Sequence, residues 1–111
     1  MSRIFVDTSG WGNLVDTRQQ FHIKTKAIYE PAKKQRTGLV TSNYVLTELV
    51  SLLTSPFRLS RDKSVSFVNG IRTSSLVDII HIDEDLDAGS WELLTNRADK
   101  NWSLVDCSSL L

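Results

Sequence analysis

The chain has 111 residues, 41% of them hydrophobic, and its 13 basic and 13 acidic residues cancel to a formal net charge of zero. One small domain is the most that this length allows, and the balanced charge excludes binding of nucleic acid through overall charge, although a local basic strip remains compatible with it. A single cysteine excludes an intrachain disulfide framework, and the sequence has neither the pattern of a signal peptide nor an apolar run of the ~20 residues that span a bilayer, so we expect a cytoplasmic protein without membrane association.

The first third of the chain alternates apolar and helix-forming segments. Residues 3–7 are predicted to be a strand covered on both faces, because their centre is continuously apolar. Residues 7–10, with the sequence DTSG, predict a polar turn. Residues 17–36 are mostly helix-forming, and Pro31 predicts a kink or the start of a second short helix.

The rest of the chain continues this alternation. Gly38 ends the helical region, Thr41 or Ser42 can cap the next helix, and Pro56 terminates it. The patterns predict strands over residues 39–41 and 76–83, and helices over residues 43–55, 61–74, 84–98 and 103–111. Strands that alternate with helices indicate an α/β fold with a parallel sheet.

Acidic and polar side chains follow the predicted strands. Ligands bind outside the carboxyl ends of the strands in open parallel sheets, which makes Asp7 a candidate site residue after the first strand. An Asx-type turn explains Asp7 equally well. Residues 41–43 follow the second strand, and Asp83 follows the third, where we favour a helix N-cap over a site role.

Glu48 lies at the edge of the buried face expected for the helix over residues 43–55. At about 100° per residue, this glutamate falls just outside an apolar arc. No lysine or arginine stands three or four residues away to pair with it. An exposed helix glutamate and a metal ligand both fit this position. The arc consists of Val45, Leu46, Leu49, Val50, Leu52 and Leu53.

Asp106 has a local explanation of its own. Ser103 followed by an acid three residues later resembles a capping box, so helix capping alone accounts for Asp106. Together with Asp7 and Glu48, however, it supplies a third carboxylate, and Mg²⁺ and Mn²⁺ prefer oxygen ligands. Such an ion polarises a phosphoryl oxygen. The sequence offers no His/Cys cluster for zinc and no glycine-rich phosphate loop.

Four segments together resemble PIN domains, specifically the VapC-type toxins of bacterial toxin–antitoxin pairs. They are FVDTSGW (5–11), LVTSNYVLTELVSLL (39–53), IDEDLDAGSWELL (82–94) and ADKNWSLVDCSSL (98–110), and they cover nearly the whole chain in order. The resemblance implies a three-layer α/β/α fold with a parallel sheet. A fourth acid and two later strands of the family have no counterpart here, so we expect a single, incomplete PIN domain over residues 1–111, with its C-terminal strands missing and its first strand at a sheet edge.

The resemblance also implies a site, a cofactor and partners. It puts catalytic, metal-binding carboxylates at Asp7, Glu48 and Asp106, with supporting roles for Ser9, Asn43 and, ranked lower, Asp99. The implied cofactor is Mg²⁺ or Mn²⁺. RNA is the implied substrate and a cognate antitoxin the implied protein partner, and a homodimer is compatible with both. RNA could approach along Lys24, Lys26, Lys33, Lys34 and Arg36, although a solvated helix face explains this run as well.

Two further functions stay open beside a Mg²⁺-dependent endoribonuclease of toxin–antitoxin type. The first is a catalytically impaired PIN remnant that binds an antitoxin or another PIN chain, which the missing fourth acid and strands suggest. The second is a phosphohydrolase of another α/β family with an aspartate after its first strand, although the rest of such a site is absent from the sequence.

Overall fold

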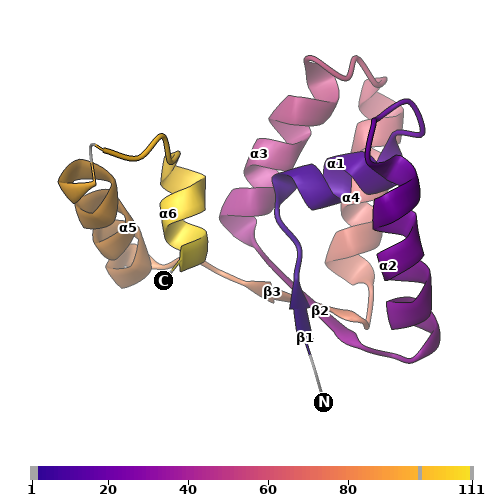
Figure 1. Ribbon diagram of the computed structural model, residues 1–111, viewed down its shortest axis with the longest axis horizontal. Coiled ribbons are helices and arrows are strands. Elements are labelled where there is room, and N and C mark those ends of the chain that lie inside the picture. The colour runs from indigo at the N-terminus through magenta and orange to yellow at the C-terminus, as the bar shows by residue number, and fades with distance from the viewer. Residues whose placement is uncertain (1–2, 98, 111) are drawn as a thin grey trace.

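The computed structural model describes residues 3–97 and 99–110, which form a parallel sheet flanked by helices (Figure 1). This arrangement confirms the α/β prediction. In chain order the elements are β1 (Arg3–Phe5), α1 (Thr8–Val15), α2 (His22–Lys34), β2 (Gly38–Ser42), α3 (Asn43–Thr54), α4 (Arg61–Thr73), β3 (Val77–Ile80), α5 (Glu84–Asn96) and α6 (Leu104–Leu110).

The described sheet has the strand order β1-β2-β3, with both pairs parallel. Phe5 pairs with Val40, which in turn pairs with Asp78. The strand β2 lies in the centre and is almost entirely buried. The strand β1 is hydrogen-bonded to β2 alone and is therefore an edge strand of the described sheet, as expected.

Helix α3 lies at the centre of the hydrophobic core. It packs against α1, α4, α6 and β2, and its apolar side chains meet those of the surrounding helices and of β2 (Figure 1). This burial stabilises a helix whose isolated sequence would be only marginally stable at 12 residues. The buried cluster consists of Trp11, Ala32, Leu39, Val45, Leu46, Leu49, Leu53, Val68 and Ile71.

The predicted cover on both faces of the first strand is wrong. Ile4 packs against the core cluster, whereas Phe5 points to the other face and is 43% exposed. Side chains alternate along a strand, so a continuous apolar run still divides between two faces. The face of Phe5 also carries the exposed side chains of Asp78 and Ile80.

Two further expectations, a separate polar turn at residues 7–10 and a second short helix that starts at Pro31, are not met. The polar stretch at residues 7–10 is the N-cap and first turn of α1 rather than a separate turn, because Asp7 accepts a hydrogen bond from the backbone N–H of Gly10. Pro31 lies inside α2, which runs through it unbroken. Proline removes one backbone donor, but its own carbonyl still accepts from the N–H of Gln35 at 2.9 Å.

Helices α5 and α6 pack mainly against each other and form a hairpin beside the rest of the molecule (Figure 1). We call the remainder, β1 to β3, the body. Helix α6 packs on α3, and the Tyr44 hydroxyl of α3 donates to Asp87 of α5. Just before α5, the N–H of Ile82 donates to Asn43 Oδ1 at 2.7 Å. Among residues 3–97 and 99–110, no helix combines the length and the apolar character needed to cross a membrane.

Candidate active site

Asp7 stands at the junction between β1 and α1. Its Oδ1 accepts from the N–H of Gly10 at 2.8 Å and from the Ser9 hydroxyl at 3.5 Å, the outer limit of hydrogen bonding. A Cβ on Gly10 would lie 3.2 Å from Asp7 Oδ1, so glycine leaves room for this close approach. The helix start thus fixes one carboxylate oxygen, and the other has no hydrogen-bond partner among the residues described.

A buried hydrogen-bonded chain holds this junction in place. The Trp11 indole N–H donates to Thr41 Oγ1 at 3.1 Å, and the Thr41 hydroxyl donates to the carbonyl of Val6 at 3.0 Å. Trp11 and Thr41 are both buried. This role of Thr41 was not predicted from the sequence, where it was a candidate helix cap and one of the polar residues at the end of the second strand. A tryptophan and a threonine next to the predicted strand ends are the signal that could have suggested it.

Glu48 lies half-buried on α3, which confirms its predicted place at the boundary of the apolar face. It has no hydrogen bond or ion pair within the part of the chain that the structure describes. Its carboxylate is therefore free of protein partners there. The predicted apolar arc is correct except at Val50, which is 43% exposed.

Asp106 forms the predicted capping box. Its Oδ2 accepts from the N–H of Ser103, and its own N–H donates to Ser103 Oγ, both at 3.0 Å. Helix capping thus accounts for the position of one carboxylate oxygen of Asp106. The side chain is exposed, and its second oxygen has no hydrogen-bond partner among residues 3–97 and 99–110.

The other candidate residues act in the surrounding framework. Asn43 holds the β3–α5 connection through Ile82, and Asp83 is the N-cap of α5, as favoured from the sequence. Asp99 accepts two hydrogen bonds from Arg97, at 3.0 and 3.2 Å. These hydrogen bonds lower the pKa of the Asp99 carboxyl below its ordinary value.

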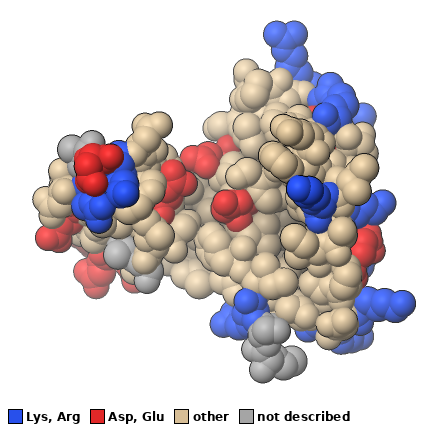
Figure 2. All heavy atoms as spheres, in the orientation of Figure 1, with Lys and Arg blue, Asp and Glu red and all other residues tan. Residues whose placement is uncertain are grey.

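Three adjoining elements carry the three predicted ligands. Helix α3, with Glu48, packs between α1, which Asp7 caps, and α6, which carries Asp106. Figure 2 shows acidic side chains where the hairpin meets the body, while most lysine and arginine side chains lie toward the outer edges.

The donor chemistry of these carboxylates fits a hard divalent cation, because each is an oxygen ligand and each keeps an oxygen without a protein partner. Within the described ranges, however, no three His, Cys, Asp or Glu side chains are gathered closely enough to hold a metal ion. The structure thus puts Asp7, Glu48 and Asp106 on neighbouring elements without assembling them into a group of three.

Comparisons with known proteins extend the resemblance over the whole chain. A family model described as "PIN domain" matches residues 4–110. The 23S rRNA-specific endonuclease VapC20 of Mycobacterium tuberculosis, in strains CDC 1551 and H37Rv, is 33% identical over 106 residues, or 96% of this chain and 76% of VapC20. The crystal structure of the M. tuberculosis toxin VapC20, described as cleaving the sarcin-ricin loop, matches with a TM-score of 0.83 over 96% of this chain and 78% of that one.

Proposed function

Because the chain belongs to the PIN domain family, we propose that it is a metal-dependent endoribonuclease of the toxin–antitoxin type. The observation that carries this proposal is the match to a toxin endonuclease in both sequence and fold, across nearly the full length of the chain. The positions of the acids support it, because Asp7 follows a parallel strand at its carboxyl end, where α/β proteins bind ligands.

In this proposal Asp7, Glu48 and Asp106 hold Mg²⁺ or Mn²⁺. The bound ion would polarise a phosphoryl oxygen and stabilise the charge that develops during phosphodiester cleavage. The chain's own contribution is orientation. Helix capping fixes one oxygen of Asp7 and one of Asp106 and so orients each carboxylate, while Glu48 is half-buried on α3.

Supporting roles follow from the contacts. Ser9 donates to Asp7 and helps to orient its carboxylate, and Asn43 accepts from the backbone N–H of Ile82 and so ties the segment before α5 to the start of α3. Asp99 accepts a hydrogen bond from Arg97 between α5 and α6, which supports a role in orienting the start of α6. We further propose that the chain works in the cytoplasm, that its protein partner is an antitoxin, and that 23S rRNA, the target named for VapC20, is the first RNA to test.

The decisive experiment compares two aspartates that cap helices in the same way. Asn caps helices as well as Asp does, so Asp7→Asn should fold normally but lower the RNA cleavage rate in Mg²⁺ by a factor on the order of 100 or more. The control is Asp83→Asn, since Asp83 also follows a strand and caps a helix but lies outside the proposed site. Cleavage is measured on 23S rRNA and on a synthetic stem-loop.

Calorimetric titration with Mn²⁺ completes this test. Wild type and Asp83→Asn should bind the ion with equal affinity, and Asp7→Asn should bind it more weakly. Equal cleavage by Asp7→Asn and wild type would contradict the assignment of Asp7. Antitoxin binding by a wild-type chain that neither binds Mn²⁺ nor cleaves RNA would instead favour the binding module considered above.

A further inference from the structure

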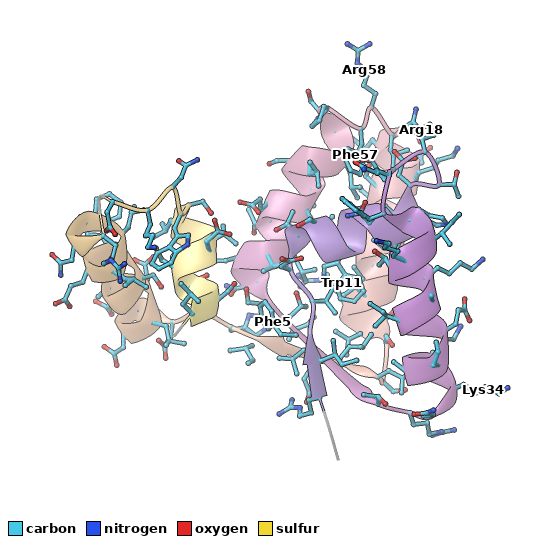
Figure 3. All side chains as sticks on the ribbon, in the orientation of Figure 1. Phe5, Trp11, Arg18, Lys34, Phe57 and Arg58 are labelled. Carbon is cyan, nitrogen blue, oxygen red and sulfur yellow. The ribbon has the colours of Figure 1, made fainter. Side chains whose placement is uncertain are left out.

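A pocket of about 870 Å³ lies at the end of the body, away from the strand ends. Two connections form its walls. Residues 15–18, between α1 and α2, line one side, and residues 58–60, between α3 and α4, line the other together with the first turns of α4. Figure 3 shows Arg18, Phe57 and Arg58 together at this end, whereas Lys34 lies at the opposite end of α2.

Cations without protein partners surround this pocket. Arg58 and Lys63 line it, and Arg61 stands between them in the sequence. All three are exposed, and none forms an ion pair within residues 3–97 and 99–110. The carboxylates that line the pocket are Asp16 and Asp62, of which Asp16 is already paired. The unpaired side chains that line the pocket therefore carry a net positive charge.

Arg18 fixes the two walls relative to each other. Its guanidinium donates to both oxygens of Asp16 at 2.9 Å and to the carbonyl of Phe57 at 2.7 Å. Asp16 is only 4% exposed, and the hydrogen bonds from Arg18 hold the pKa of its carboxyl well below the usual range. Arg18 thus has a structural role, and Arg58 and Lys63 are the side chains that can bind an anion.

The pocket and Asp7, one of the three predicted metal ligands, lie at opposite ends of helix α1. Asp7 caps the start of α1, Asp16 follows its end, and the eight residues between them span about 12 Å. On the neighbouring α3, Glu48 is in the middle and Arg58 lies just beyond the end. The pocket is therefore within the reach of a few nucleotides of an RNA strand held at Asp7.

From this geometry we propose that Arg58 and Lys63 bind a backbone phosphate of the RNA substrate, at a distance from the cleaved bond. The inference rests on the proposed function and adds a substrate contact to it. Lysine and arginine neutralise phosphates and make RNA binding salt-dependent, and the Ser60, Ser66 and Thr17 hydroxyls in the pocket are further donors.

The lysine-rich run on α2 is a weaker candidate for the same role. The hollow beside Lys33 and Lys34 is lined otherwise only by Glu30, Pro31 and Gln35, so the end of one helix shapes it. In the Arg58–Lys63 pocket, by contrast, two connections clamped by Arg18 hold the lining in place. A phosphate there would meet groups from separate parts of the fold.

The test measures RNA affinity as a function of salt. All proteins carry Asp7→Asn so that the RNA stays intact, and binding of a 23S rRNA stem-loop is followed by fluorescence anisotropy between 50 and 200 mM KCl. For single strands the slope of log K against log salt is about −0.7 for each phosphate contact. The double variant Arg58→Ala/Lys63→Ala should therefore bind more weakly and lose about 0.7 from the slope, the value for one phosphate contact. The matched control, Lys33→Ala/Lys34→Ala, should keep the slope of the parent protein.

An unchanged slope in Arg58→Ala/Lys63→Ala would overturn the proposal. The proposal would also be overturned if this variant bound RNA as the parent does but no longer bound the antitoxin. That result would show that the pocket binds a protein partner. Charge reversal, Arg58→Glu/Lys63→Glu, should weaken RNA binding further than alanine does, and equal affinities of the two double variants would also count against a phosphate contact. Failure of the proposed function is recognised separately, because the parent protein would then bind no RNA at any salt concentration.

Discussion

The body and the α5–α6 hairpin are stabilised in different ways. In the body, α3 buries Val45, Leu46, Leu49 and Leu53, whereas α5 buries only Ser90 and leaves Trp91 57% exposed. The hairpin depends on its own internal packing, on the packing of α6 against α3 and on hydrogen bonds to the start of α3. Two of the predicted ligands, Asp7 and Glu48, belong to the body, and the third, Asp106, belongs to the hairpin. Assembly of the site therefore depends on how the less deeply packed part sits on the core.

The largest effect should come from the centre of the body. Leu49→Ala removes a fully buried side chain of α3 and should lower the free energy of unfolding by about 2–5 kcal/mol. Urea denaturation followed by circular dichroism measures this loss. Leu94→Ala, at a half-buried position of α5, should cost clearly less. Equal losses of unfolding free energy in the two variants would mean that the hairpin is packed as tightly as the core of the body.

An intermediate effect should come from the ion pair that closes the far end of the body. Asp16→Asn weakens the hydrogen bonds to Arg18 and should cost about 1–2 kcal/mol at pH 7, a modest value because Arg18 is largely exposed to solvent. The folded state lowers the pKa of Asp16, so its contribution is present above the unfolded pKa of about 3.9 and is lost as the pH falls below it.

Urea denaturation at pH 7 and at pH 3 tests this dependence. Wild type should lose more stability than Asp16→Asn between these values. Asp62→Asn is the matched control, because Asp62 lines the same pocket without an ion pair among the described residues, and its removal should change stability little. A wild type and an Asp16→Asn variant with the same pH dependence would show that Arg18 does not stabilise the charged form of Asp16.

The smallest change in stability should come from the hairpin. Ser103→Ala removes one hydrogen bond of the capping box and should cost about 1 kcal/mol. Asp83→Ala removes the cap of α5 and should cost a similar amount. Only Ser103→Ala should also slow RNA cleavage, because it loosens the helix start that orients Asp106. Cleavage slowed equally by both variants would mean that general stability of the hairpin, rather than the position of Asp106, limits the reaction.

Local patterns in the sequence were sufficient to predict most elements and several caps. Asp83 and Asp106 were interpreted correctly because a cap involves residues only three positions apart. Helix α1 was missed because Asp, Thr, Ser and Gly occur both in turns and at helix starts. The same chemistry suits both structures, and only the packing of Trp11 against the core decides between them.

Contacts between distant segments were beyond the reach of such patterns. Trp11 and Thr41 are 30 positions apart, and Arg18 and Phe57 are 39 apart, so no local spacing indicates either pair. The three predicted ligands were singled out by their positions in the predicted elements and then by a family resemblance, and the structure places them on adjoining elements. Their assembly around a metal ion stays a prediction, because it depends on side-chain positions that the sequence does not encode locally.

The three tryptophans of the chain divide between the two regions. Trp11 is 2% exposed inside the body, whereas Trp91 and Trp102 belong to the hairpin, where Arg97 and Lys100 approach the Trp102 ring. Intrinsic fluorescence should therefore contain a shielded, blue-shifted component from the body and a component from Trp91 that acrylamide quenches readily. A change at the hairpin alone, such as docking of RNA or of a partner, would alter the second component and leave the first in place. The protein thus carries its own optical probe for each region, with no label attached.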